Sequence, residues 1–405
     1  MNGPGTRASR AALILFTILF ILSQLILSKP LSAFPPLAPG IYSCPMRLLH
    51  EIVSLRTKHP FIIARGGRSA YETVWVRVVD EDGAEGWGEA APSRYYGESP
   101  QTVVAALERF APVLERADAW SLEAVEREMN RAVGRNGSAK SAVSAALHDL
   151  AAKRLGVPLY RMWGLDPAEA PQSSFTIAIA ADQDELIRRV EEAAPYPVLK
   201  VKLGTDRDAE IIRTVRMAAP DKTLRVDANA AWTAKHALRM VELLLDYDVE
   251  FVEQPLPPED VEGMRFVRDR SPLPIIGDES CIVAADVPKL AGVVDGVNLK
   301  LSKCGGLREA LKIIAAARAH GMLVMCGCMI ETSLGLAPAA HFAPLLDYAD
   351  LDGAALLAED PCEGLSIDGG DIRLSGRPGL GIEPRGARAG GAAASSRGRP
   401  AGVTS

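Results

Sequence analysis

The feature that most constrains the fold is a regular alternation of short apolar segments and helical patterns between residues 170 and 360. The apolar segments are SFTIAIA, PVLKVKLG, TLRVDANA, VEFVEQP, LPIIGDES, VDGVNLKLSK, GMLVMCGC and YADLDG. Each of the first seven is followed by a helical pattern such as TAKHALRMVELLLDY. This order predicts an α/β fold: a modified (β/α)8-type barrel, (β/α)7β, of eight parallel strands. An open doubly wound sheet is the alternative, but it seldom has eight units, and no glycine-rich dinucleotide loop follows the first segment.

The residues before and after the barrel divide into further segments. Residues 46–165 combine strand patterns with the alanine-rich helical pattern SAKSAVSAALHDLAAKRLG, which ends at Gly156, a residue suited to a helix C-cap. They predict an α+β domain in which DEDG is a hairpin turn and HPFIIARGGRSAYE a glycine-punctuated loop. Residues 361–385 are expected to return to this domain. Residues 386–405 have low complexity, which predicts disorder.

Residues 1–45 differ in composition from the rest of the chain. The run AALILFTILFILSQLILS (11–28) is uncharged and has about the length that spans a bilayer. Three readings stay open: a membrane anchor, a long signal peptide, or sequence upstream of a true initiator at Met46. We expect a cytoplasmic protein on the last reading, and a membrane-anchored or exported one on the other two.

Charge and cysteine content narrow the range of partners. The net charge of −6 and the lack of a long basic run argue against nucleic acid. The six cysteines do not have the paired spacing of a zinc site, and nothing in their pattern requires an oxidising compartment. Nucleic acid is therefore not the expected partner.

Carboxylates end three successive barrel segments: Asp227, Glu253 and Asp278, which we call the acidic triad. In a barrel of this type the C-terminal ends of the strands converge, and the chemistry takes place there. Like charges at close range repel each other unless a cation neutralises them. Magnesium suits carboxylates that leave coordination positions open for substrate oxygens. The sequence therefore predicts one Mg²⁺ ion per active site on the triad.

Lysines flank the triad on both sides. Lys200 and Lys202 lie two residues apart in the second segment and so share one face of a strand, while Lys300 ends the sixth segment. A substrate carboxylate on the metal would present its α-carbon between Lys202 and Lys300. The metal would stabilise the enediolate formed when the α-proton leaves. One lysine would remove the proton and the other would return one to the opposite face, which inverts the centre.

Two other classes of protein are alternatives to this hypothesis. A Schiff-base aldolase would also use a lysine on the sixth strand, but it does not need the acidic triad. A membrane-tethered peptide-binding protein would use the apolar start of the chain as its anchor, but binding alone does not require two opposed lysines.

The motifs LKVKLG, RVDANAAW, VEQP, GDES and NLKLSKCGG, in this order, resemble the enolase superfamily and, within it, the muconate-lactonising-enzyme subgroup. The resemblance covers about residues 46–385 and implies a capping domain on a modified barrel. We also expect a homo-oligomer. The resemblance implies roles for individual residues: metal ligands at Asp227, Glu253 and Asp278, acid/base lysines at Lys202 and Lys300 with Lys200 as their electrostatic neighbour, and supporting side chains at Asn229 and Glu279.

The last barrel segment distinguishes among the activities of this subgroup, which contains cycloisomerases, o-succinylbenzoate synthases, N-acylamino acid racemases and dipeptide epimerases. Asp350 and Asp352 share one face and can hold the free α-ammonium group of a dipeptide. An acylated amino acid has no such cation, so two buried aspartates would then be destabilising. This Asp-x-Asp pattern resembles that of the dipeptide epimerases.

The loop after the first strand carries two arginines, Arg65 and Arg68. In the family this loop closes over the substrate and reads the epimerised residue. Either arginine could pair with a glutamate side chain, which would imply L-Ala-D/L-Glu as the substrate and the recycling of cell-wall peptides as the context. A different dipeptide is the direct alternative.

Overall fold

The computed structural model describes residues 45–385. The predicted leader or anchor, including 11–28, and the predicted disordered tail 386–405 lie outside the described residues. Within the described part of the chain, no helix is both long enough and apolar enough to cross a membrane. The five cysteines found there are free thiols.

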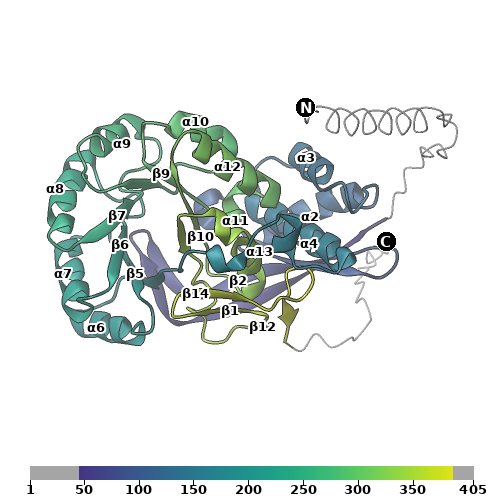
Figure 1. Ribbon diagram of the computed structural model, residues 1–405, viewed down its shortest axis with the longest axis horizontal. Helices are drawn as coiled ribbons and strands as arrows, with labels where there is room; N and C mark the ends of the chain where they lie inside the picture. The colour runs from purple at the N-terminus through teal and green to yellow at the C-terminus, as the bar shows by residue number, and fades with distance from the viewer. Residues whose placement is uncertain (1–44, 386–405) are drawn as a thin grey trace, which may run out of the picture. The chain divides into compact units, whose positions relative to one another are not determined.

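Eight parallel strands form one sheet, in the order β11-β10-β9-β8-β7-β6-β5-β4 (Figure 1). The strands are β4 (Phe175–Ile177), β5 (Val198–Lys202), β6 (Thr223–Asp227), β7 (Val249–Glu253), β8 (Ile275–Gly277), β9 (Gly296–Leu299), β10 (Leu323–Gly327) and β11 (Tyr348–Asp350). The first and last strands also meet, because Ser174 N donates to Ala349 O at 3.0 Å. The sheet therefore curls into a nearly closed barrel, which confirms the predicted (β/α)7β fold.

A helical segment follows each of the first seven strands, and several of these helices line the outer side of the barrel in Figure 1. They are α6 (Gln183–Glu192), α7 (Asp208–Ala218), α8 (Ala234–Leu245), α9 (Val261–Arg268), η4 (Ala284–Asp286) with α10 (Val287–Leu290), α11 (Leu301–Cys304) with α12 (Leu307–Ala319), and α13 (Ser333–Phe342) with η5 (Ala343–Leu345). Their apolar faces follow the helical repeat, as in α8, where Ala237, Met240, Val241 and Leu244 are buried. The packing of these faces against the strands makes the main core.

The chain after β11 forms short strands in place of an eighth helix. These are β12 (Cys362–Glu363), β13 (Leu365–Asp368), β14 (Asp371–Leu374) and β15 (Glu383–Pro384). β13 pairs with β14, and β12 pairs with β15.

The N-terminal capping domain combines a three-stranded antiparallel sheet with helices. Its elements are β1 (Arg47–Ile63), β2 (Gly66–Val79), β3 (Glu85–Ala90), η2 (Arg94–Tyr96), α2 (Pro100–Leu114), α3 (Leu122–Ala132), α4 (Gly137–Leu155), α5 (Leu159–Met162) and η3 (Pro167–Glu169). Helix α4 is buried along most of its length and ends at Gly156 with φ of 70°, as predicted. The domain limits predicted from the sequence stay predictions.

Glycines allow β3 to approach α4 closely. A Cβ atom at Gly86 would lie 1.9 Å from Ala146 O, and one at Gly88 would lie 2.1 Å from Ala142 O. No side chain fits at such distances, so the alternate glycines of GWG let the strand lie directly on the helix.

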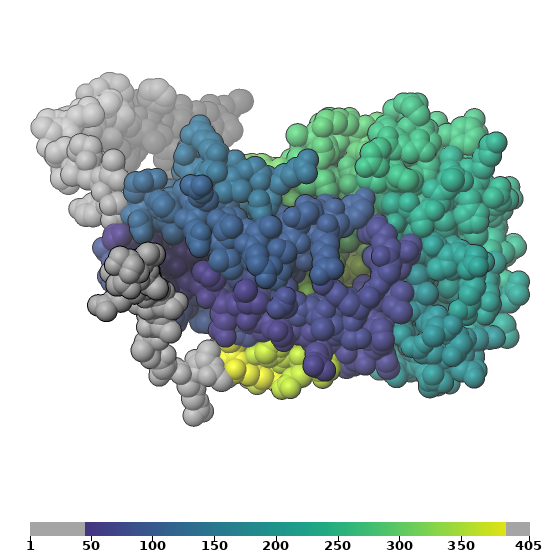
Figure 2. All heavy atoms as spheres, turned by 180° about the vertical axis from the view of Figure 1, so that it is seen from behind, coloured from purple at the N-terminus to yellow at the C-terminus, as the bar shows by residue number. Residues whose placement is uncertain are grey.

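The loop predicted at HPFIIARGGRSAYE is wrong. β1 continues to Ile63 and β2 begins at Gly66, so only two residues, Ala64 and Arg65, form the turn. The glycines serve this tight turn, in which Gly66 has φ of 94°. Because Ile179 N donates to Ile62 O at 3.0 Å, the hairpin tip is attached to the barrel. In Figure 2 the residues of the capping domain (purple and blue) cover much of the face turned to the viewer, and a hollow opens among them.

Candidate active site

The acidic triad lies at the C-terminal ends of β6, β7 and β8. Asp227 and Glu253 are the last residues of their strands and pair in register, and Asp278 follows β8 directly. All three are buried, and their ligand atoms lie within 4.8 Å of one another. Glu253 Oε2 accepts no hydrogen bond of good geometry, although Lys200 Nζ is 2.7 Å away. Three buried carboxylates whose ligand atoms converge in this way fit a hard divalent cation.

The lysines reach the triad from both sides of the strand order. Lys202 on β5 places its Nζ 2.6 Å from Asp227 Oδ2, and Lys300 after β9 places its Nζ 2.6 Å from Asp278 Oδ2. Since β6, β7 and β8 lie between β5 and β9, the two amines flank the triad from opposite sides. The predicted arrangement of lysines and acids is therefore present.

The electrostatics of this cluster follow from burial and close charges. Burial and the negative charge of Asp227 raise the pKa of Glu253 to about 7. Burial alone would lower the pKa values of Lys200 and Lys300, but neighbouring carboxylates outweigh it and raise both. A divalent cation on the triad would compete with these ammonium groups for the carboxylate oxygens.

Asp350 and Asp352 lie on the same face but have different partners. Asp350 Oδ2 is 2.6 Å from Lys200 Nζ, and Asp350 Oδ1 accepts from Ser174 Oγ at 2.7 Å. Asp352 Oδ2 accepts from Thr176 N at 2.6 Å. Within the described residues, Asp352 has no ion-pair partner, and burial together with the charge of Asp350 raises its pKa to about 7. Of these two aspartates, Asp352 is therefore the one that has no cation beside it among the described residues.

Ser174 and Thr176 are residues that the sequence analysis missed. They lie two residues apart at β4 and hold Asp350 and Asp352 across the seam where the barrel closes. The sequence signal was the alternation of hydroxyl and apolar residues in SSFTI, which places both hydroxyls on the inner face.

The candidate site opens into a cavity of about 390 Å³ between the capping domain and the barrel mouth. Most of the site residues predicted from the sequence line it: Arg65, Arg68, Lys200, Lys202, Asn229, Asp278, Glu279, Lys300, Asp350 and Asp352. Asp227 and Glu253 are fully buried next to it and do not line it. Residues of the capping domain and of the first and last barrel strands therefore meet at one place.

The two arginines of the hairpin have different environments. Arg65 donates to Asn229 O at 2.6 Å and to Glu279 Oε1 at 2.7 Å, which ties the hairpin tip to the barrel. Arg68 stacks on the ring of Tyr71, with its guanidinium carbon 4.5 Å from the ring centre. No carboxylate among the described residues lies within ion-pair distance of Arg68. Arg68 is thus the arginine that can meet an added anion.

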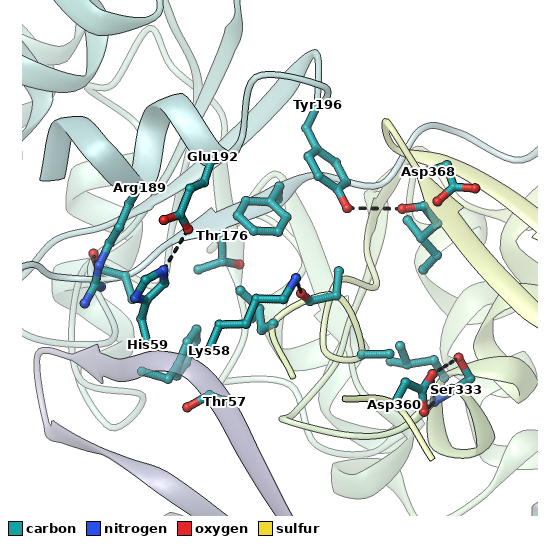
Figure 3. Close-up of a pocket in the computed structure, with 18 of the residues that line it drawn as sticks. Thr57, Lys58, His59, Thr176, Arg189, Glu192, Tyr196, Ser333, Asp360 and Asp368 are labelled. Carbon is teal, nitrogen blue, oxygen red and sulfur yellow. Dashed lines mark hydrogen bonds and ion pairs between the residues drawn. The ribbon is translucent and has the colours of Figure 1, made fainter. Parts of the chain in front are cut away.

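Figure 3 shows a second cavity, of about 410 Å³. It lies beside the first, because Phe61, Thr176 and Leu356 line both. The polar side chains labelled there bond within the protein: His59 Nε2 is 2.7 Å from Glu192 Oε2, and Ser333 Oγ donates to Asp360 Oδ2 at 2.5 Å. The acidic triad and its lysines do not line this cavity. It is therefore not the candidate active site.

Comparison with known proteins agrees with this geometry. The model of the mandelate racemase / muconate lactonizing enzyme N-terminal domain matches residues 49–164, and the enolase C-terminal domain-like model matches 182–388. The chain belongs to the mandelate racemase/muconate lactonizing enzyme family.

Three proteins that are similar to this chain are named as epimerases. The L-Ala-D/L-Glu epimerase of Bacteroides thetaiotaomicron is 38% identical over 338 residues, which is 83% of this chain and 88% of that protein. The structure of a dipeptide epimerase from Enterococcus faecalis with Mg and L-Leu-L-Tyr matches with a TM-score of 0.80 and 31% identity, over 84% of this chain and 99% of that one. The substrate-liganded L-Ala-D/L-Glu epimerase of Bacillus subtilis matches with a TM-score of 0.80 and 32% identity, over 84% and 98%.

Proposed function

We propose that this family member is a dipeptide epimerase, an isomerase that inverts the α-carbon of the C-terminal residue of a dipeptide. The observation that carries the proposal is one cavity that holds two opposed lysines at an acidic triad together with an unpaired acid, Asp352. The lysines suit proton transfer on both faces of a carbon, and the acid suits a substrate ammonium group. Similarity to named epimerases supports the same reading.

Asp227, Glu253 and Asp278 would hold one Mg²⁺ ion. When bound, the ion supplies positive charge that binds the substrate carboxylate and stabilises the charge that develops as the α-proton leaves. Asn229 supports this arrangement, because its backbone N–H donates to Asp227 Oδ1 at 2.8 Å.

Lys202 and Lys300 do the proton chemistry in this proposal. One amine takes the α-proton while the opposite ammonium donates a proton to the other face, and the reverse reaction exchanges their roles. Lys200 is completely buried between Asp350, Glu253 and Asp227, so it acts as a fixed positive charge beside them.

Asp352 would bind the α-ammonium group of the dipeptide. Asp350, which Lys200 and Ser174 already hold, adds negative charge next to it. A desolvated carboxylate without a cation is destabilising on its own, so a bound ammonium group restores the balance. An N-acylated amino acid would not do so, which favours dipeptides over the other substrates of this family.

The side chain of the epimerised residue would lie under the β1–β2 hairpin. Arg68 suits a glutamate carboxylate, which supports L-Ala-D/L-Glu and a place in the recycling of cell-wall peptides. The cavity is also lined by Ile63, Met329 and Ile330, which suit an apolar side chain. A hydrophobic dipeptide such as that in the Enterococcus faecalis complex is therefore the second candidate.

Turnover in deuterated water tests the function. With Mg²⁺ present, we expect deuterium to enter the C-terminal α-carbon of L-Ala-L-Glu or L-Leu-L-Tyr while the epimer accumulates. EDTA should stop the reaction, whereas a Schiff-base aldolase would stay active and be trapped by borohydride. Exchange into N-acylamino acids with none into dipeptides would refute the proposal.

We also propose a homo-oligomer and a cytoplasmic location, with an anchored or exported chain as the alternative through residues 11–28. Light scattering on the purified protein gives the mass of the assembly. Sequencing the mature N-terminus in fractionated cells separates the readings of the first 45 residues.

A further inference from the structure

Lys303 is a buried cation that lies three residues after Lys300, on the one-turn helix α11. Its side chain has no exposed surface. Its Nζ lies 2.5 Å from Asp278 Oδ1, 2.6 Å from Asp278 O, 2.9 Å from Asn298 O and 3.0 Å from Cys281 O. This single ammonium group therefore connects the end of β8 to the end of β9.

The Asp278 carboxylate is shared between two lysines. Oδ1 faces Lys303, and Oδ2 lies 2.6 Å from Lys300 Nζ. Lys300 lines the cavity, whereas Lys303 does not. When Lys300 turns to the substrate, Lys303 still compensates the charge of Asp278, so this buried carboxylate keeps a cation beside it.

The backbone at Lys303 is fixed by the capping domain. A Cβ atom at Gly137, the first residue of α4, would lie 2.3 Å from Lys303 O. The helix start therefore packs directly on this turn. Gly305, with φ of 89°, ends α11 in a conformation that favours glycine. Lys303 thus points at Asp278 from a rigid position.

We propose that Lys303 is a positioning residue for the reaction: it holds the Asp278 carboxylate in its ligand position and leaves Lys300 free to exchange protons with the substrate. The inference rests on the proposed function. Without Lys303, the negative charge of Asp278 is no longer shared between two lysines. The whole attraction of this carboxylate then acts on the Lys300 ammonium group and retains it beside Asp278. Proton transfer on the Lys300 side should then suffer more than transfer on the Lys202 side.

The test measures the two faces separately in Lys303→Met. Lys202→Ala and Lys300→Ala first assign the epimer whose α-proton each lysine removes, because each variant should retain exchange of one epimer. In Lys303→Met, we expect exchange through Lys300 to fall about tenfold more than exchange through Lys202. Calorimetry should show Mg²⁺ affinity reduced about tenfold, the size expected when a group that orients a metal ligand is lost.

The control is Lys312→Met, which removes an exposed lysine paired with Glu123 at 2.6 Å and should change neither quantity. Lys303→Gln keeps two N–H donors without the charge, and it answers the question if the methionine variant does not fold. Equal loss of both exchanges, or an unchanged or higher Mg²⁺ affinity, would overturn the inference. If the wild-type protein turns over no dipeptide, the proposed function fails, and calorimetry still tests whether Lys303 positions Asp278.

Discussion

At the scale of the residue, the site depends on buried charges that compensate one another. Lys200 has three carboxylates within 3.6 Å, so it stays charged and is a poor base. Lys300 has Asp278, which Lys303 also holds. Of the acids discussed at this site, Asp352 is the exception, because it is buried and has no ion-pair partner among the described residues. Substitution of Asp352 therefore tests the proposed ammonium site directly.

Replacing Asp352 by Asn should remove the charge that attracts the dipeptide ammonium group. Truncating one partner of a buried charge pair costs about 2–5 kcal/mol, so kcat/KM for dipeptides should fall by at least about thirtyfold. The fold should persist, since the amide oxygen can still accept from Thr176 N. Steady-state kinetics on L-Ala-L-Glu and L-Leu-L-Tyr measure the effect. Asp368→Asn, an exposed aspartate, is the control, and unchanged turnover in Asp352→Asn would remove the ammonium assignment.

At the scale of the element, the β1–β2 hairpin decides which side chains lie across the cavity from the lysines of the barrel. The tip is attached to the barrel through Ile62 and Arg65, and both Arg65 and Arg68 line the cavity. Arg65 is paired with Glu279, whereas Arg68 has no carboxylate within ion-pair distance among the described residues. The position of this arginine follows from strand pairing, since Arg68 lies opposite Phe61 in the hairpin.

Arg68→Met should change the preference for the epimerised side chain. We expect kcat/KM for L-Ala-L-Glu to fall about tenfold or more, because a charge-assisted hydrogen bond is worth about 1.5–3 kcal/mol. Turnover of L-Leu-L-Tyr should hold or rise. Competition between the two dipeptides measures the ratio directly, with Arg56→Met on β1 as the control. A parallel loss for both substrates would show that Arg68 supports the hairpin and does not read the side chain.

The contact between β3 and α4 gives a prediction about stability. A methyl group at Gly88 would overlap Ala142 O, so Gly88→Ala should force the strand away from the helix. Overpacking of this kind costs about 1–3 kcal/mol. Gly134→Ala, where no atom lies within 4 Å of the added Cβ, is the matched control. Chemical denaturation should show a lower unfolding free energy for Gly88→Ala alone.

At the scale of the whole molecule, a buried carboxylate joins the capping domain to the barrel. Glu89 on β3 accepts from Thr332 N at 3.3 Å and from Gly335 N at 3.0 Å. Burial raises the pKa of Glu89 to about 7. The folded chain therefore keeps a proton there at pH values at which the unfolded chain has lost it.

The unfolding free energy should therefore depend on pH through Glu89. Between about pH 4.5 and 7 the unfolded state binds fewer protons at Glu89 than the folded state. The contribution of Glu89 to the unfolding free energy therefore falls as pH rises. In Glu89→Gln this contribution is absent. The unfolding free energy of the variant relative to wild type should thus increase from pH 5 to pH 8, by about 1–3 kcal/mol. Urea denaturation at both pH values measures it, with the exposed Glu51→Gln as control; a constant difference would contradict the prediction.

The sequence by itself determined the barrel and the cluster of acids and lysines at its mouth. Alternating strand and helix patterns specify a parallel barrel, and such a barrel brings the ends of its strands together whatever the loops do. Each of the strands β5 to β9 ends at or just before a residue of the site, so strand order alone brings these residues together: Asp227, Glu253, Asp278, Lys202 and Lys300.

The tertiary structure decided the contacts between distant segments. Ser174 and Thr176 meet Asp350 and Asp352 only because the first and last strands close the barrel, more than 170 residues apart. Which of the two cavity arginines keeps its charge available for a substrate depends on the register of the hairpin and on its attachment to the barrel. These contacts depend on geometry that only the folded chain fixes, since a shift of one residue in a strand turns each side chain to the other face.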